Sequence, residues 1–392
     1  MKKNSIRRIS TTILALCALC INTYANDGGY FVSGNHLIPI SNTDIKIAKE
    51  VLTIKLSDTT EYTYVDVDYT FVNNSSKPKT VKMGFEAEIE DLYKLPEEGV
   101  KGHPYIYDFT VELNGKHVNH TNEFAFYSDS EGLDYKNFPV DKTKWILGGD
   151  KYEDDGGWDR GLMNVKTKEF YAYAHVYYFE VTFKPGENKI HHTYRYLAGM
   201  GQEDAFTVKY WLKPAMRWEG NKIEDFTLRI SAENTAKDFI LNGPFDDKGS
   251  FRIASGTGKT RISKYGREFV IRNGVVEYNC KDFIPNKDLL IKSPDTYIYK
   301  DHEENNTEHV LGEFYDRGEY YWLPMLYGEY SDWSKRILRN LPYASRGYVF
   351  KDKKLADYFS QFFWYMPDPS WTPSQADFTE WERNFVKSFS KQ

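Results

Sequence analysis

The stretch Thr63-Tyr64-Val65-Asp66-Val67-Asp68-Tyr69-Thr70-Phe71-Val72 decides the class of fold, because apolar side chains recur at every second residue. That period is typical of a β-strand with one buried face. Residues 51–56 alternate in the same way, and residues 80–85 resume the pattern after the turn cluster Asn73-Asn74-Ser75-Ser76-Lys77-Pro78. These patterns predict several short strands joined by turns.

Turn signals continue along the chain. Asn114-Gly115 is a strong hairpin signal, Pro185-Gly186-Glu187-Asn188 reverses the chain, and Asn273-Gly274 separates two apolar runs. Further strands are expected at residues 109–113, 176–183, 189–196, 206–212, 226–230, 269–271 and 275–278. The sequence therefore predicts a mainly β protein built as antiparallel β-sandwich domains, not as a parallel sheet.

Composition shifts divide the chain into regions. Residues 26–128 form a first β-sandwich region and residues 165–295 a second β-rich region. Between them, residues 129–164 are rich in Gly and Asp and are expected to form a long surface insertion, the kind of loop that often carries function. Residues 296–330 are a connector to the C-terminal region.

Residues 331–392 change to a helical period. One helical face is predicted to hold Trp333, Ile337, Leu338 and Leu341, and a second to hold Leu355, Tyr358, Phe359 and Phe362. Thr379 and Glu382 have the spacing of a capping box at the start of a third helix. Pro342 lies in the first of these segments and predicts a kink or stop near Leu341. A small three-helix module is expected.

The N-terminus predicts export. A basic head (Lys2, Lys3, Arg7 and Arg8) precedes an uncharged apolar run at residues 9–21, which is too short to span a bilayer. We expect residues 1–25 to be a signal peptide cleaved after Ala25, and the mature chain to lie in the periplasm or outside the cell. Leu16 and Leu19 stand where a lipobox has a small residue, so a lipid anchor is not expected.

Export changes both the charge and the thiol content. Loss of the four basic residues of the leader takes the formal net charge from −6 to −10, which disfavours nucleic acid as a partner. Cys280 is then the remaining cysteine, and we expect it to be buried. Aromatic residues make up 17% of the chain, with 31 Tyr, a composition that suits sheet-rich extracellular domains and carbohydrate-binding surfaces alike.

Two family resemblances rest on short motifs. Leu338-Arg339-Asn340-Leu341-Pro342-Tyr343-Ala344-Ser345-Arg346-Gly347-Tyr348-Val349-Phe350 resembles the signature of the YARHG domain, which implies a presumed extracellular bacterial module without an assigned activity. Ser345 and Arg346 stand where the family has Arg and His. The β-rich part resembles a family of secreted bacterial domains of unknown function over most of residues 28–291. The segments that carry this resemblance are residues 50–54, 69–73, 183–188, 218–220 and 283–289.

Three motifs resemble nucleotide, glycosidase or metal sites but lack features that those sites need. Residues 254–260 end in Gly-Lys-Thr, but Ile253 occupies the position where a Walker A loop needs Gly, so we expect a hairpin turn there instead of a phosphate site. Glu86, Glu88 and Glu90 share a face if their strand continues, yet a glycosidase needs a second carboxylate from elsewhere. His191 and His192 are adjacent on a strand and point to opposite faces, so they do not ligate one metal together.

Three groups of residues remain as candidate sites. Asp154, Asp155 and Asp159, around two glycines, suit Ca²⁺, and no other cofactor is expected. Trp158 in the same loop offers a ring to stack on a sugar. Arg336, Arg339, Arg346 and Tyr343 make the C-terminal module locally basic, which suits an anionic glycan or a carboxylate, although ordinary salt bridges and packing are the favoured explanation.

The leading hypothesis is a non-enzymatic envelope or cell-surface protein that binds cell-wall or glycan material. Exposed aromatic side chains beside basic groups on the folded surface would favour it. A structural or assembly role in the envelope, with an envelope protein as partner, is the alternative. A glycan hydrolase comes third and needs two facing carboxylates about 5–10 Å apart. The oligomeric state stays open.

Overall fold

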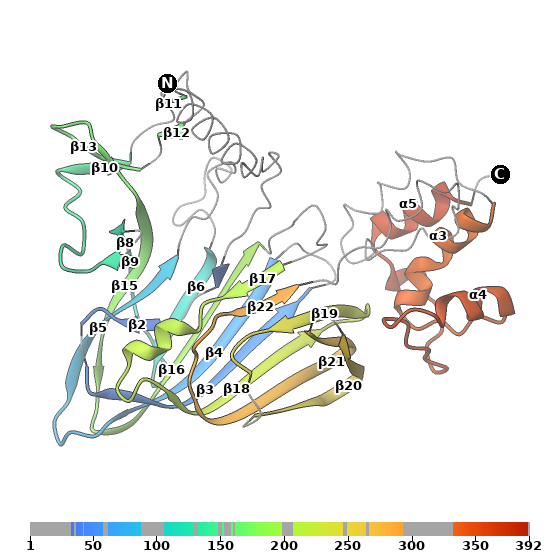
Figure 1. Cartoon of the computed structure of the whole chain (residues 1–392), viewed down its shortest axis with the longest axis horizontal. Helices are drawn as coiled ribbons and strands as arrows, with labels where there is room; N and C mark the ends of the chain where they lie inside the picture. Colours follow the sequence, from blue (N-terminus) through green and yellow to red (C-terminus); the bar gives the residue numbers. More distant parts are fainter. Residues whose placement is uncertain are drawn as a thin grey trace, which may run out of the picture.

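The computed structural model describes residues 33–34, 37–41, 43–57, 62–87, 106–128, 132–147, 151–152, 158–159, 161–197, 207–245, 249–263, 266–292 and 332–390. A β-rich body precedes a helical module, which lies beside the β19–β21 end of that body (Figure 1). The predicted signal peptide and the connector 296–330 fall outside the described residues. The predicted fold class, mainly β with a C-terminal helical module, is confirmed.

Twelve of the described strands form one large sheet, in the order β1-β17-β22-β19-β21-β18-β3-β4-β16-β6-β7 with β20 beside β21. Its central strands are β18 (Ile223–Ala232), β3 (Ile45–Leu56), β4 (Tyr62–Asn73), β16 (Gly186–Leu197) and β6 (Ile106–Leu113). The remaining strands are β1 (Ser33–Gly34), β7 (Lys116–His117), β17 (Thr207–Tyr210), β19 (Lys237–Asn242), β20 (Ser250–Ser263), β21 (Gly266–Phe283) and β22 (Leu289–Lys292).

This sheet mixes strands from the two β-rich regions that the sequence separates. β3 and β4 come from residues 26–128, whereas their neighbours β18 and β16 come from residues 165–295. Most pairs are antiparallel, as expected, but β3 pairs with β18 in parallel, and so does β1 with β17. The two regions therefore belong to one sheet.

The large sheet branches at β21. One edge of β21 pairs with β20 along its length, while the other edge pairs with β19 near residues 267–271 and with β18 near residues 274–283. The branch that starts at β19 runs through β22 and β17 to β1, and in β17 the backbone oxygen of Lys209 accepts a hydrogen bond from Tyr196 Oη of β16 at 2.9 Å. The branch thus lies over the central strands and encloses apolar side chains between them.

A second sheet, β2-β5-β15-β8-β9, completes the sandwich. Its strands are β2 (Leu37–Pro39), β5 (Lys79–Ala87), β15 (Tyr173–Phe183), β8 (Thr121–Ser128) and β9 (Gly132–Asp134). Phe85 of β5 contacts Phe109 of β6 and Tyr194 of β16, with ring centroids 5.2 and 4.8 Å apart. These contacts between sheets make one continuous core, the packing expected of a sandwich.

Two buried asparagines fix the corners where the chain crosses between the sheets. Asn73, at the end of β4, donates from Nδ2 to the backbone oxygen of Phe183 at 3.2 Å. Asn188 donates to the backbone oxygens of Lys184 and Gly186 at 2.8 and 3.1 Å, and its Oδ1 accepts from Lys184 N. The predicted turn at residues 185–188 is therefore an arch from one sheet to the other, because β15 and β16 belong to different sheets.

Short strands occupy the predicted insertion at residues 129–164. They are β9, β10 (Trp145–Leu147), β11 (Lys151–Tyr152), β12 (Trp158–Asp159) and β13 (Leu162–Asn164), followed by β14 (Phe170–Tyr171). Tyr135 anchors the insertion to the core, because its hydroxyl lies 2.5 Å from Glu86 Oε1, which also accepts from Arg217 at 2.7 Å. Arg217 closes the 3-10 helix η1 (Lys213–Arg217).

Two expectations about the second region are wrong. Asn273-Gly274 is not a turn between strands, since β21 runs through it; Asn273 takes a φ of +46° inside the strand, where it forms an irregularity opposite β20. Residues 254–260 do not form a hairpin turn either. They lie in β20, where Gly256 has a φ of +72° and packs against the backbone of Asn273. Close backbone approach at a bulge explains both glycines better than a turn does.

The C-terminal module contains α3 (Asp332–Ser345), α4 (Lys353–Phe359), the 3-10 turn η6 (Gln375–Asp377) and α5 (Glu380–Ser388). The predicted capping box of Thr379 and Glu382 is present. Of the kink or stop predicted near Leu341, the stop is wrong, because α3 continues through Pro342 to Ser345. The helix ends soon after, and Gly347 takes a φ of +83°. Among the described residues, no helix is long and apolar enough to cross a membrane.

Candidate ligand-binding site

The outer face of the large sheet carries a group of tyrosines around one arginine. Strand alternation buries Val65, Val67 and Tyr69 of β4 and turns Tyr62 and Tyr64 outward. Arg195 of β16 pairs in register with Tyr64 on one side and with Tyr107 of β6 on the other. We call Tyr62, Tyr64, Tyr107 and Arg195 the tyrosine platform.

Arg195 organises the platform. Its guanidinium carbon lies 4.1 Å from the ring centroid of Tyr62 and 5.2 Å from that of Tyr107, both within cation–π range. Its Nε donates to Asp108 Oδ2 at 2.6 Å, and this hydrogen bond raises the pKa of Arg195. Asp108 reaches it because β6 bulges there, with a φ of +54° at Asp108. A bulge often redirects a side chain in this way.

Polar groups continue the platform along the same strands. Asp66 and Asp68 are the next outward residues of β4, and His191 of β16 lies opposite them. His191 Nδ1 is 3.0 Å from Asp68 Oδ1 and 3.8 Å from Asp66 Oδ1. Burial raises the pKa of Asp66, and His191 opposes that shift. The three groups can accept and donate hydrogen bonds to hydroxyls, and their ligand atoms lie within 4.8 Å of one another.

The two adjacent histidines do point to opposite faces. His192 is fully buried and stacks on Tyr69, with ring centroids 5.7 Å apart and an interplanar angle of 9°. His191 faces the exposed carboxylates. The expectation that they do not share a metal is consistent with this alternation.

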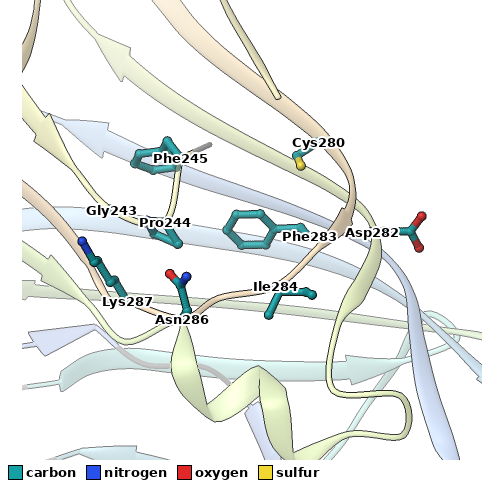
Figure 2. Close-up of a pocket in the computed structure, with 9 residues that line it drawn as sticks. All are labelled: Gly243, Pro244, Phe245, Cys280, Asp282, Phe283, Ile284, Asn286 and Lys287. Atoms are coloured by element: carbon teal, nitrogen blue, oxygen red, sulfur yellow. The ribbon is translucent and has the colours of Figure 1, made fainter. Parts of the chain in front are cut away.

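A cavity of about 370 Å³ lies elsewhere on the β-rich body, below the loop that follows β19 (Figure 2). Its walls combine aromatic rings with exposed polar groups; they are Gly243, Pro244, Phe245, Cys280, Asp282, Phe283, Ile284, Asn286 and Lys287. A Cβ atom at Gly243 would lie 2.5 Å from the ring of Phe245, so this ring would have to move to admit a larger residue. An adjoining cavity of about 440 Å³ shares Phe245 and adds Arg267 and Ser250.

Cys280 is buried in the wall of this cavity, as predicted, with 4% of its surface exposed. Its Sγ lies 3.4 Å from the backbone oxygen of Lys281. Asp282 is the one carboxylate among the residues that line either described cavity, and it pairs with Lys222 at 2.5 Å. The cavity therefore offers a small amphipathic recess rather than a pair of facing carboxylates.

Glu86, considered above as part of an acidic surface, is instead buried. It is 3% exposed and holds both Arg217 and Tyr135. Burial and the charge of Glu86 raise the pKa of Tyr135 well above its usual value. Glu88 and Glu90 lie outside the described residues. Glu86 thus has a structural position between the core and the insertion.

The predicted basic group of the helical module is not gathered on one surface. Arg346 is 4% exposed and makes a bidentate pair with Glu382, Nη1–Oε1 2.8 Å and Nη2–Oε2 2.9 Å. Arg336 pairs with Asp352 at 2.9 Å, and Arg339 is half-buried. The ring of Tyr343 packs 4.8 Å from that of Phe378. These residues therefore do not form one ligand-binding surface, because Arg346 is buried inside the module.

The calcium and sugar-stacking hypotheses for the insertion stay predictions. Asp154 and Asp155 lie outside the described residues, while Trp158 and Asp159 are placed only as backbone in β12. The sequence patterns do not predict the platform. Alternation alone puts Tyr62, Tyr64, Asp66 and Asp68 on one face, but it gives no sign that Arg195 and Tyr107 lie beside them.

Two parts of the chain match the models of known domain families. Residues 319–392 match the model of the YARHG domain, and residues 25–209 match that of DUF4424, a domain of unknown function. The chain thus carries a YARHG domain at its C-terminus and a DUF4424 domain in its N-terminal part, as the two sets of motifs predicted. The YARHG match begins earlier than the predicted boundary at residue 331.

No curated protein matches the chain. Among solved structures, a "putative nutrient binding protein" from Legionella pneumophila is 21% identical, with 93% of this chain and 100% of that chain covered and a TM-score of 0.47. Yeast LTA4 hydrolase is 8% identical, with 60% and 29% covered and a TM-score of 0.18. At such TM-scores neither likeness bears on function.

Proposed function

We propose that this chain is an exported binding protein that holds cell-wall or other glycan material on the tyrosine platform. The observation that carries the proposal is the grouping of three outward tyrosines around Arg195 beside Asp66, Asp68 and His191. Aromatic faces offer large, rigid contact area, and the surrounding charged groups offer hydrogen bonds in fixed directions.

The shape of the platform suits an extended ligand. Tyr62, Tyr64, Asp66 and Asp68 follow one another on the outer face of β4, and at roughly 3.4 Å per residue they cover about 20 Å. A strip of this length has room for several sugar units. Stacking on the tyrosines would leave the carboxylates and His191 to bind hydroxyl groups.

Binding rather than hydrolysis fits the exposure of the platform. Tyr64 is 36% exposed, and the side chains of Asp66 and Asp68 are 52% and 67% exposed. Catalysis in a cleft depends on excluding water from the reacting groups. A flat strip on the open face of a sheet supports retention of a polymer instead.

The test is retention of the mature protein, residues 26–392, on purified cell wall and on a panel of immobilised glycans at micromolar concentration. We expect retention on at least one member, and Tyr64→Ala to weaken it about tenfold, the loss that follows from about 1.4 kcal/mol of binding free energy. Tyr171→Ala is the matched control, because Tyr171 is 49% exposed but lies on β14. No retention on any member would contradict the proposal, as would equal losses in both variants.

A further inference from the structure

The helical module packs against the outer face of the large sheet at β21. Phe269 and Ile271 of this strand point into the core of the β-rich body, while Val270 points outward and is fully buried. Val270 and Ala236, which precedes β19, belong to the same apolar cluster as Leu338, Phe359 and the other core residues of the module. The two parts of the chain therefore share a buried apolar contact.

Arg272 is the polar centre of this contact. Its side chain is 3% exposed, its Nη1 donates to the backbone oxygen of Met366 at 2.7 Å, and its Nη2 lies 3.5 Å from Asp368 Oδ2. Burying an arginine without hydrogen-bond partners would cost free energy. These two acceptors offset that cost for the guanidinium of Arg272. Both come from the module.

The signature turn of the YARHG domain supplies the surface opposite Arg272. Gly347, the last residue of the motif Tyr343-Ala344-Ser345-Arg346-Gly347, has a φ of +83°, and a Cβ atom there would lie 2.1 Å from Arg272 Nη1. The backbone oxygen of Ser345 accepts a hydrogen bond from Ala236 N at 3.0 Å. The contact thus depends both on the positive φ of Gly347 and on its lack of a side chain.

A second set of contacts lies on β20. The ring of Phe363 covers two outward cations, with its centroid 5.0 Å from Lys259 Nζ and 4.2 Å from Arg261 Cζ. Lys259 also donates to the backbone oxygen of Tyr365 at 3.2 Å. The sheet therefore presents cations, and the module presents carbonyl oxygens, a carboxylate and an aromatic face.

We propose that the signature turn at residues 345–347, together with residues 363–368, is a docking surface whose partner is the cationic β20–β21 face of the same chain. Arg272 is the residue that this surface recognises. In this role the motif fixes the module to the β-rich body, so that the two parts move as one unit. The proposal stands apart from glycan binding, since Tyr62, Tyr64, Tyr107 and Arg195 take no part in it.

Amide hydrogen exchange of the whole mature protein tests the proposal, with Arg272→Ala compared with Arg252→Ala. Arg252 lies on β20, the strand beside that of Arg272, and its guanidinium pairs with Glu277 of β21 and, among the described residues, not with the module. We expect Arg272→Ala to speed exchange at residues 345–348 and 363–368, and at the Ala236 amide, by tenfold or more. Exchange in α5 should stay within twofold of wild type, and Arg252→Ala should change none of these segments.

Phe363→Ala provides a second, milder variant in case Arg272→Ala fails to fold. It should speed exchange around residues 363–368 and on β20 near Lys259 and Arg261, while α5 stays protected. Unchanged exchange at the contact in Phe363→Ala or in a folded Arg272→Ala would overturn the proposal. Loss of protection spread evenly over the whole module would overturn it as well, because the residues would then serve the module's own fold.

Discussion

Arg346 and Glu382 show how a residue that looks like a ligand contact is used inside the fold. Both side chains are almost fully buried, and Arg346 also lies 4.7 Å from the ring centroid of Phe378. Glu382 meanwhile accepts from Thr379 N at 2.8 Å as part of the capping box. One carboxylate thus links the start of α5 to the signature turn.

Arg346→Ala should lower the free energy of unfolding by about 3–5 kcal/mol, because it leaves the Glu382 carboxylate buried without its partner. The measurement is urea unfolding at pH 7, followed by circular dichroism. Arg336→Ala is the matched control, since its pair with Asp352 is exposed to water and should matter little. Equal losses in the two variants would contradict the buried role of Arg346.

His175 gives the fold a pH dependence. Burial, and then the charge of Lys142, lower the pKa of His175 from its ordinary 6.5 to about 4. Above pH 6.5 the ring is neutral in both the folded and the unfolded chain. Between pH 6.5 and about 4 the unfolded chain binds the proton first, so this contribution to stability is lost as the pH falls.

His175→Phe keeps an aromatic ring and removes the proton. The free energy of unfolding of this variant should fall less steeply between pH 6.5 and 4 than that of the wild type, and the two should be close at pH 7.5. Denaturant unfolding at a series of pH values measures both slopes. Parallel curves over the whole range would show that His175 is not the titrating group.

At the scale of elements, Asn188 stabilises the corner between β15 and β16 together with Asn73. Asn188 is fully buried and makes its hydrogen bonds to the backbone of the turn that joins the two sheets, with a further contact from Asn114 at 3.2 Å. Its neighbour Glu187 is exposed. The buried side chain of Asn188 therefore stabilises the turn.

Asn188→Ala should cost about 1–3 kcal/mol of stability, because three partly buried hydrogen bonds to the backbone of the turn are lost. Glu187→Ala, at the same turn, should stay within about 0.5 kcal/mol of wild type. Thermal unfolding of both variants checks this. A loss for Asn188→Ala no larger than that for Glu187→Ala would show that the arch does not depend on its side chain.

Local patterns predicted most elements and failed at specific places. The alternation of residues 63–72, the hairpin at Asn114-Gly115 and the capping box at Thr379 all depend on neighbours in sequence, and each is present. Asn273-Gly274 has the composition of a turn but lies in a strand, because positive φ serves a bulge as well as a turn. The local sequence does not distinguish a bulge from a turn.

At the scale of the whole molecule, the pairing of strands could not be predicted from the sequence. β3 and β18 are neighbours in the sheet, although Glu50 and its partner Phe226 are far apart in the chain. The tyrosine platform depends on the same long-range pairing, which brings β4, β16 and β6 together. The composition indicated a surface rich in tyrosine, but the place of that surface is visible only in the folded structure.

The outer face of the large sheet then has two uses. At β20 and β21 it is covered by the helical module, which buries Val270 and Arg272. At β4, β16 and β6 it presents the platform residues, with Tyr64, Asp66 and Asp68 exposed. We propose a structural role for the covered part and ligand binding for the exposed part.

Hydroxyl-radical footprinting of the mature protein, with and without the glycan that it retains, tests the assignment of the platform most directly. Bound glycan should slow the oxidation of Tyr62, Tyr64 and Tyr107 severalfold and leave Tyr171 on β14 unchanged. Equal oxidation of the three platform tyrosines in both samples, while the protein remains bound to the glycan, would place the binding site elsewhere.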